Sequence, residues 1–186
     1  MPTSAKKIIV LDRDGVINVD SDAYIKSPDE WIPLPGALEA IARLTQAGYR
    51  IAVATNQSGI GRGLFDMNTL NAMHLKMHKM VAAVGGRIDA VFFCPHTAED
   101  QCECRKPKPG MLKMIADRFE IDPEETPCVG DALRDLQAAA ALGFIPHRVL
   151  TGKGKKTLAA GGLPEGTIVH EDLRAFSLDF LSEELE

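Results

Sequence analysis

The sequence predicts an α/β fold, in which a mostly parallel sheet is covered by helices on both faces. Short runs of apolar and β-branched residues alternate with segments of helical periodicity along the chain. The first two runs, residues 7–11 and 50–55, are almost entirely apolar, as expected for strands that are buried on both sides. A length of 186 residues corresponds to about one domain, so we expect residues 1–186 to form a single domain.

Strands and helices follow one another in chain order. Six runs are predicted as strands, the last more weakly patterned than the others: residues 7–11, 50–55, 90–94, 128–130, 144–150 and 167–169. Five segments are predicted as helices: residues 36–47, 67–84, 110–119, 132–142 and 172–183. The Gly- and Lys-rich segment 151–156 is interpreted as a surface loop. This alternation is typical of a Rossmann-like sheet.

Composition and charge exclude several classes of protein. The chain is 45% hydrophobic and 25% charged, which is ordinary for a globular protein and excludes a disordered or collagen-like chain. No apolar run approaches the roughly 20 residues of a membrane-spanning helix, and the polar start lacks the apolar centre of a signal peptide. A net charge of −5 argues against nucleic-acid binding. We therefore expect a cytoplasmic monomer without a membrane or nucleic-acid partner.

Polar side chains follow the predicted strands at the points where the strands end. Asp12 and Asp14 come after the first strand, Thr55 ends the second, Lys106 lies in the loop after the third, and Asp131 follows the fourth. In a parallel sheet these positions meet at one edge, where ligands bind. Two neighbouring carboxylates repel each other unless a cation or a shared proton lies between them, and Mg²⁺ prefers oxygen ligands. An Asp- and Gly-rich turn would explain one acidic pair, but it would not explain the ordered set.

A second group of chemically distinctive residues lies in and before segment 95–109, which has neither helical nor strand periodicity. Four potential zinc ligands fall within eleven residues there: Cys94, His96, Cys102 and Cys104. Three thiolates and one imidazole suit tetrahedral Zn²⁺ and leave no position for water, so the predicted role is structural. Separate buried or surface cysteines are the alternative. Cys128, alone in an apolar strand, is interpreted as a core residue.

The strand-end residues, in this order, resemble the motifs of the haloacid-dehalogenase-like phosphohydrolases over roughly residues 8–150. That family has a DxDG motif, a Thr, a Lys and a GDxxxD motif. The resemblance implies that Asp12 attacks phosphorus and forms a phosphoaspartate, and that Asp14 is the general acid and then the general base. It also implies that Thr55 and Lys106 stabilise the transferring phosphoryl oxygens.

The same resemblance implies a Mg²⁺ site and its ligands. The ion would be held by the Asp12 carboxylate, by Asp14 through its backbone carbonyl, and by the Asp131 carboxylate. Asp135 either lies behind these ligands or orients Lys106. A zinc-clipped loop would fix the backbone that carries Lys106, because Cys104 stands only two positions before it.

Three longer stretches narrow the resemblance: LDRDGVIN, TNQSGIGRG and CPH…CxCRKPxPGM. They are similar to the heptose-bisphosphate phosphatases of lipopolysaccharide synthesis, a subgroup without a large cap domain. This implies a small phosphorylated sugar as substrate and removal of its phosphate on carbon 7. The implied substrate contacts are Asp20, Asn56, Gln57, Ser58 and Arg105. Segment 20–24 reads DSDAY, which differs from the DHGY of some members.

Two other functions stay open at this point. The histidinol-phosphate phosphatases share the acidic pair and the zinc clip, although Ser58 and the Gly-Arg-Gly run 61–63 favour the heptose enzymes. A zinc-clipped binding module without turnover is possible in principle, but the intact set of strand-end residues argues against it. His74 and His78 are interpreted as the flank of a helix, and the lysines at 153, 155 and 156 as solvated.

Overall fold

A six-stranded parallel sheet forms the centre of the structure, a computed structural model that describes residues 7–185. The strand order is β3-β2-β1-β4-β5-β6. The strands are β1 (Ile8–Leu11), β2 (Arg50–Asn56), β3 (Ala90–Cys94), β4 (Pro127–Gly130), β5 (Ile145–Val149) and β6 (Ile168–His170). The chain runs outward from β1 to β3 and then crosses to β4 on the other side of β1. The gap between the ends of β1 and β4 is therefore the topological switch point, where open α/β sheets bind ligands.

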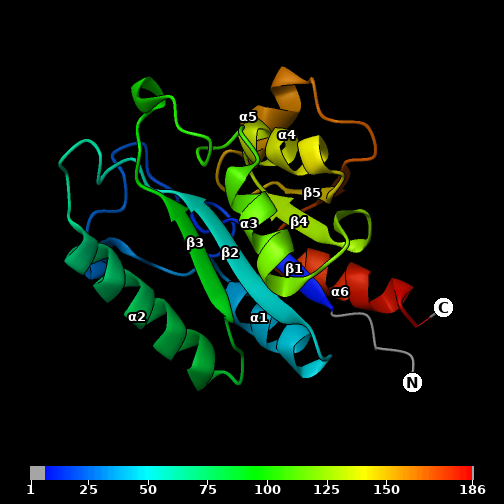
Figure 1. The fold of residues 1–186 in the computed structure, drawn as a ribbon. Helices are drawn as coiled ribbons and strands as arrows, with labels where there is room; N and C mark the ends of the chain where they lie inside the picture. The colour runs from blue at the N-terminus through cyan, green and yellow to red at the C-terminus, as the bar shows by residue number, and fades with distance from the viewer. Residues whose placement is uncertain (1–6, 186) are drawn as a thin grey trace.

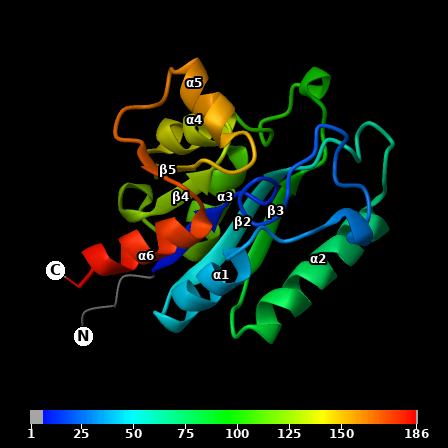
Figure 2. The same ribbon diagram turned by 180° about the vertical axis from the view of Figure 1, so that it is seen from behind.

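Helices cover both faces of this sheet, as Figures 1 and 2 show from opposite sides. The helices are α1 (Ala37–Gln46), α2 (Met67–Ala83), α3 (Gly110–Phe119), α4 (Leu133–Leu142), α5 (Gly154–Ala160) and α6 (Leu173–Glu183). Buried side chains of α1, α2 and α6 belong to one apolar cluster, and those of α3 and α4 belong to another. None of the helices in residues 7–185 is long and apolar enough to span a membrane.

The alternation of side chains along β1 explains the two clusters. Ile9 and Leu11 point into the cluster under α1, α2 and α6, whereas Ile8 and Val10 point into the cluster under α3 and α4. Successive side chains of a strand point to opposite faces, so a strand that is apolar throughout must be covered twice. The two layers of helices hold the carboxyl ends of the central strands in fixed positions.

The predicted fold class is confirmed, and one predicted loop is wrong. Segment 151–156 is interpreted from the sequence as a surface loop, but α5 begins within it at Gly154. The Thr157 side chain donates a hydrogen bond to the Asp131 carbonyl, and the backbone N–H of Lys153 donates one to the Asp131 carboxylate. Tertiary contacts thus support a seven-residue helix that is too short to form on its own.

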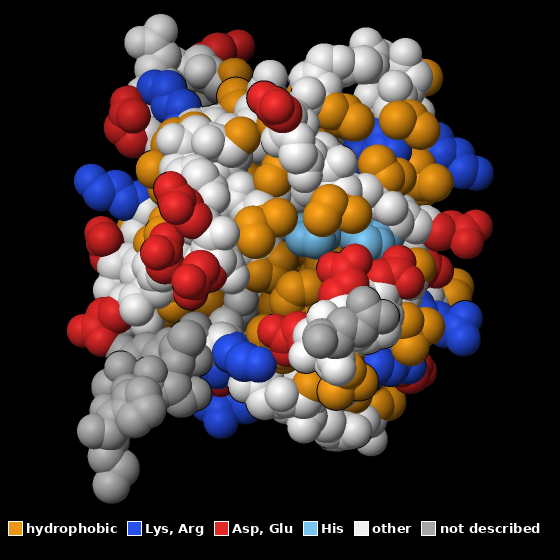
Figure 3. Space-filling view, turned by 90° about the vertical axis from the view of Figure 1, so that its right-hand side faces the viewer, with side chains coloured by type: hydrophobic (Ala, Val, Ile, Leu, Met, Phe, Trp, Pro, Cys, Tyr) orange, Lys and Arg blue, Asp and Glu red, His pale blue; other side chains and the backbone are white. Residues whose placement is uncertain are grey.

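The long segment after β3 matches its prediction more closely. Residues 95–109 contain no α-helix or strand, and their one regular turn is a short 3₁₀-helix at Ala98–Asp100. The Asp100 carboxylate holds the start of that turn, because it accepts hydrogen bonds from the Thr97 N–H at 2.8 Å and from the Thr97 hydroxyl at 3.1 Å. Figure 3 shows the side of the molecule that lies at the right of Figure 1, where acidic and basic side chains are interspersed.

Candidate active site

A cavity of about 240 Å³ lies at the carboxyl ends of the central strands. All ten residues that the sequence proposes for chemistry, Mg²⁺ binding or substrate binding line it: Asp12, Asp14, Asp20, Thr55, Asn56, Gln57, Ser58, Arg105, Lys106 and Asp131. They come from the ends of β1, β2 and β4 and from the loop after β3. The switch point of the sheet has therefore brought the separate motifs together at one place.

Asp12 lies at the floor of this cavity, directly after β1. Its backbone N–H donates to the Val129 carbonyl at 2.9 Å, which extends the pairing of β1 with β4 by one residue. Its Oδ1 oxygen accepts a hydrogen bond from the backbone N–H of Arg13 at 2.8 Å and lies 3.1 Å from Lys106 Nζ. The carboxylate is almost fully buried, so these contacts fix its orientation.

Lys106 is held from several sides although its loop has little regular structure. Its Nζ lies 2.7 Å from Asp135 Oδ1 and donates to the Ala54 carbonyl at 2.8 Å. The Asn56 side chain accepts from the Lys106 N–H at 3.0 Å and donates to the Lys106 carbonyl at 3.1 Å. Burial acts to lower the pKa of Lys106, but the charges of Asp12 and Asp135 outweigh it and raise the pKa. The ammonium therefore stays charged, and Asp135 orients it by direct contact.

Three carboxylates form a compact acidic cluster next to Lys106. Asp12, Asp131 and Asp135 each offer an oxygen, and these oxygens all lie within 4.8 Å of one another. Burial raises the pKa of Asp12 to about 7 and that of Asp131 to about 9, and the nearby charge of Asp135 adds to both shifts. Deprotonating both groups without a counter-ion is costly, and a divalent cation would remove that cost. The donor set consists of carboxylate oxygens, which suits Mg²⁺.

Asp14 lines the same cavity, but its carboxylate is turned to other partners. Oδ1 accepts from Arg13 Nε at 3.0 Å, from Arg13 Nη2 at 2.8 Å and from Asn18 Nδ2 at 2.8 Å. Oδ2 accepts from Gln57 Nε2 at 3.0 Å, and the same nitrogen contacts Thr55 Oγ1 at 2.9 Å. The Asp14 side chain thus lies outside the acidic cluster, in keeping with an Mg²⁺ contact through its backbone carbonyl only.

Two glycines make room for the Asp131 carboxylate. Gly15 and Gly152 have φ of +84° and +55°, and a Cβ at either position would overlap that carboxylate. Close approach of this kind, together with a positive φ, requires glycine. Thr151 ties the two segments together, because its hydroxyl donates to the Gly15 carbonyl at 2.7 Å. The turn into α5 is therefore built around Asp131.

The wall of the cavity includes residues that sequence reasoning missed. Arg134 and Lys153 line it beside the predicted Arg105 and Lys106, so four cations face six carboxylates there. Lys153 is not simply solvated as predicted, because its Nζ lies 2.6 Å from Asp20 Oδ2. Arg134 lies in the first turn of α4, three residues after Asp131, and its place in the GDxxxD stretch could have revealed it. Lys153 offered no comparable signal.

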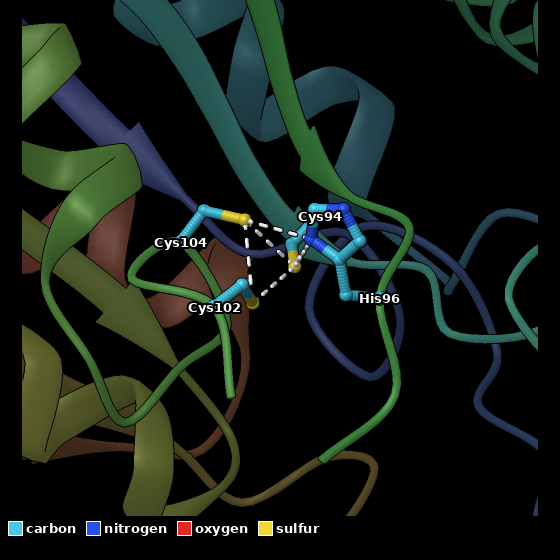
Figure 4. A group of neighbouring side chains, drawn as sticks. All are labelled: Cys94, His96, Cys102 and Cys104. Atoms are coloured by element: carbon cyan, nitrogen blue, oxygen red, sulfur yellow. Dashed lines mark hydrogen bonds between the residues drawn. The ribbon is translucent and has the colours of Figure 1, made fainter. Parts of the chain in front are cut away.

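Cys94, His96, Cys102 and Cys104 form a second potential metal centre (Figure 4). The Cys94 and Cys102 sulfurs are 3.6 Å apart, those of Cys102 and Cys104 are 3.6 Å apart, and those of Cys94 and Cys104 are 3.0 Å apart. His96 Nδ1 lies 3.6 Å from the Cys94 sulfur and 3.4 Å from that of Cys104. In a tetrahedron with Zn–S of about 2.3 Å, ligand atoms are separated by about 3.6–3.8 Å. Four of these five separations lie within about 0.2 Å of that range, and the Cys94 and Cys104 sulfurs need only move apart for the four side chains to hold a zinc ion.

The chemistry of the thiols agrees with such a site. All four cysteines of the chain are free, including Cys128, which is buried among apolar side chains as predicted. Burial raises the pKa of Cys94 to about 12 and so opposes its thiolate. Burial acts to raise the pKa of Cys102 too, but hydrogen bonds, first that from the Arg105 N–H, outweigh it and lower the pKa to about 6, which favours the thiolate. Metal binding displaces thiol protons, because thiolates are the ligands. Cys94 ends β3, where its carbonyl accepts from the Gln57 N–H at 2.7 Å, so this centre is joined directly to the cavity wall.

Comparison with known proteins gives one family match and several close relatives. The family model for haloacid dehalogenase-like hydrolases matches residues 5–143. A curated relative from Bordetella bronchiseptica, D-glycero-beta-D-manno-heptose-1,7-bisphosphate 7-phosphatase, is 62% identical over 177 residues, which cover 95% of this chain and 99% of the relative.

Two solved structures are similar over the same length. The D,D-heptose 1,7-bisphosphate phosphatase from B. bronchiseptica, complexed with magnesium and phosphate, superposes with a TM-score of 0.94 at 62% identity. The D,D-heptose 1,7-bisphosphate phosphatase from Burkholderia thailandensis superposes with a TM-score of 0.78 at 72% identity. Each comparison covers 95% of this chain and 99% of the other.

Proposed function

The chain belongs to the haloacid dehalogenase-like hydrolases and is a phosphatase, and we propose that it removes the 7-phosphate of D-glycero-β-D-manno-heptose 1,7-bisphosphate. The observation that carries the proposal is the convergence of Asp12, Asp14, Lys106 and Asp131 in one cavity, in a chain 62% identical to a relative of that activity. The β anomer and the heptose are taken from the name of that relative. The corresponding pathway is heptose-nucleotide synthesis for lipopolysaccharide.

Asp12 is the nucleophile in this proposal. Its carboxylate attacks phosphorus, the bond to the sugar oxygen breaks, and Asp14 gives that oxygen a proton. Asp14 then takes a proton from water, which attacks the phosphoaspartate and releases inorganic phosphate and free Asp12. The support is geometric, since both side chains line the cavity and each is held by several hydrogen bonds.

Lys106 and Thr55 would hold the transferring phosphoryl group. The Lys106 ammonium contacts Asp12 directly, so its charge lies beside the oxygens of a phosphoryl group bound there. The Thr55 hydroxyl oxygen accepts a hydrogen bond from Gln57 Nε2, and the same nitrogen donates to Asp14 Oδ2. We propose that Gln57 and Asn56 act mainly by fixing these groups, because their amides are already engaged with Asp14, Thr55 and the Lys106 backbone.

Mg²⁺ would be held by Asp12, by Asp14 through its carbonyl oxygen, and by Asp131. When bound, the ion supplies positive charge between the nucleophilic carboxylate and the phosphate. The raised pKa values of Asp12 and Asp131, caused first by burial and then by the charge of Asp135, support a cation at this place. Asp135 holds Lys106 and stays behind the proposed ligands.

A structural Zn²⁺ bound by Cys94, His96, Cys102 and Cys104 would support the same chemistry from outside the cavity. Arg105 and Lys106 follow Cys104 directly, so fixing the loop fixes both cations. Metal coordination would replace the secondary structure that residues 95–109 lack.

The substrate contacts proposed for the cavity wall are Asp20, Ser58 and Arg105, which line it within reach of a small phosphorylated sugar. The predicted monomeric state, single domain over residues 1–186 and cytoplasmic location remain parts of the proposal. They concern the setting of the reaction and leave its chemistry unchanged.

The deciding experiment compares phosphate release with Mg²⁺ from the α and β anomers of the heptose 1,7-bisphosphate and from histidinol phosphate. We expect the highest kcat/KM for the β anomer, with the 1-phosphate retained in the product. A preference for histidinol phosphate would overturn the substrate. If the chain releases phosphate from none of these esters, the binding-module alternative is favoured.

A further inference from the structure

A buried chain of hydrogen bonds links helix α2 to Asp14. Arg13 Nε and Nη2 donate to Asp14 Oδ1, at 3.0 Å and 2.8 Å, and Arg13 Nη1 lies 3.2 Å from His74 Nε2. The Arg13 side chain is fully buried, and His74 is nearly so. Within the described residues, the wall of the cavity includes neither of them. The chain of contacts from His74 through Arg13 nevertheless leads to Asp14, the proposed general acid and base.

The direction of the Arg13–His74 bond follows from the chemistry of its partners. A guanidinium has five N–H donors and no acceptor, so His74 Nε2 must be the acceptor. The imidazole is therefore neutral, with its proton on Nδ1. The surroundings agree, because burial and then the charge of Arg13 together lower the pKa of His74 to about 4. His74 thus serves as a fixed acceptor for one corner of the guanidinium.

The same bonds leave the two oxygens of Asp14 unequal. Oδ1 accepts three donors, two from Arg13 and one from Asn18. A proton on Oδ1 would point at those N–H groups, so this oxygen cannot carry one without breaking them. In the part of the chain that the structure describes, Oδ2 accepts a single hydrogen bond, from Gln57. Oδ2 is therefore the oxygen with room for a proton.

We propose that His74 is a positioning residue for Asp14, which acts through Arg13 to hold Oδ1 and thereby aims Oδ2 at the leaving group. This rests on the proposed function, in which Asp14 protonates the sugar oxygen. Without His74 the guanidinium has a buried, unpaired N–H and is free to turn about the Cδ–Nε axis of Arg13. If the guanidinium turns, its two parallel hydrogen bonds to Asp14 Oδ1 are lost. The Asp14 carboxyl then shifts, and the proton on Oδ2 moves away from the leaving oxygen of the substrate.

The test compares leaving groups. An alkyl phosphate such as the sugar substrate needs a proton on its leaving oxygen, whereas p-nitrophenyl phosphate releases a stable anion without one. His74→Leu removes the acceptor at similar volume. The comparison uses kcat/KM, which reports formation of the phosphoaspartate and departure of the leaving group, and not the later hydrolysis that both esters share. We expect His74→Leu to lower kcat/KM on the sugar phosphate about 10- to 100-fold, part of the 10²–10⁴ of a general acid, and to change kcat/KM on p-nitrophenyl phosphate less than about 3-fold.

Three further variants separate positioning from packing. His74→Gln keeps an acceptor oxygen and should restore most of the kcat/KM on the sugar phosphate. His74→Met is a second apolar replacement, matched to the neighbouring Met73 and Met77, and should repeat the selective loss if the leucine variant unfolds. His78→Ala changes an exposed histidine one turn along α2 and should leave both activities at the wild-type level.

Each outcome decides between the alternatives. Equal losses on the two esters, or no loss with folded His74→Leu and His74→Met, would overturn the positioning role. If the wild-type chain hydrolyses neither ester in the presence of Mg²⁺, the proposed function itself is wrong. That result is distinct from a failure of the positioning role, because it appears before any variant is made.

Discussion

Replacement of Lys106 by methionine tests the electrostatic organisation of the site most broadly. The ammonium is about 4% exposed and lies 3.1 Å from the Asp12 carboxylate and 2.7 Å from that of Asp135. Lys106→Met keeps the length of the side chain but removes the cation, so two buried carboxylates lose their counter-charge. Removing one partner of a buried pair costs about 3–5 kcal/mol, because the other partner stays buried and uncompensated.

A matched control is two residues away. Lys108 Nζ lies 3.0 Å from Glu103 Oε1, at side chains that are 47% and 86% exposed. Exposed pairs of this kind contribute about 0–1 kcal/mol, because water screens them. Lys108→Met therefore removes an ion pair of similar length at little cost, and the difference between the variants isolates the effect of burial.

The assay is urea unfolding of wild type and both variants near pH 7, first without added Mg²⁺ and then with excess Mg²⁺. We expect Lys106→Met to lower the free energy of unfolding by about 3–5 kcal/mol without Mg²⁺, and Mg²⁺ to recover part of the loss. Phosphate release should fall by about 10²–10³ in kcat, the usual effect of losing a group that stabilises the transition state. A loss of stability equal to that of Lys108→Met would refute the reasoning.

Three other predictions concern the catalytic cavity and the Cys and His group beside it. Asp12→Asn should abolish phosphate release without lowering the thermal midpoint, because Lys106 keeps Asp135 as its counter-charge and the repulsion among the clustered carboxylates falls. Residual turnover at the wild-type rate would remove Asp12 as nucleophile. Metal analysis should find about one zinc per chain, and removing the zinc with a strong chelator should lower the thermal midpoint and the activity. A fully active chain without zinc would contradict the proposed structural zinc site. The folded-state pKa values of Asp12 and Asp131 are raised to about 7 and about 9, so the stability these groups contribute without metal is lost as pH rises through that range. The stabilisation by Mg²⁺, measured as a shift in thermal midpoint, should therefore grow from pH 6.5 to 9, and a shift that shrinks over this interval would contradict the assignment.

The strand-end motifs were predictable because their geometry follows from chain order. In a parallel sheet, the residue after a buried strand lies at the ligand-binding edge whatever the rest of the chain does. Asp12, Thr55 and Asp131 could therefore be placed together without coordinates, and the family that they indicated is confirmed. The four potential zinc ligands could also be grouped from the sequence, since all four fall within eleven residues.

Other parts of the site depend on contacts that no local pattern carries. Arg13 and His74 are 61 residues apart, and periodicity placed His74 only on the flank of a helix. Lys153 stands in a Gly- and Lys-rich stretch whose helix forms through bonds to Asp131. Such features need the folded structure, because a short helix or a buried charge is stabilised by tertiary partners rather than by its own sequence.

The central claim is that Asp12 carries the phosphoryl group during turnover, and chemical trapping tests it most directly. The enzyme is mixed with Mg²⁺ and heptose 1,7-bisphosphate, quenched within one turnover, and reduced with borohydride, which converts a phosphoaspartate to homoserine. Peptide mass spectrometry should then find homoserine at position 12 in the wild type and unchanged side chains in an Asp12→Asn sample. Homoserine at another aspartate, or full turnover with position 12 unmodified at every quench time, would contradict the account.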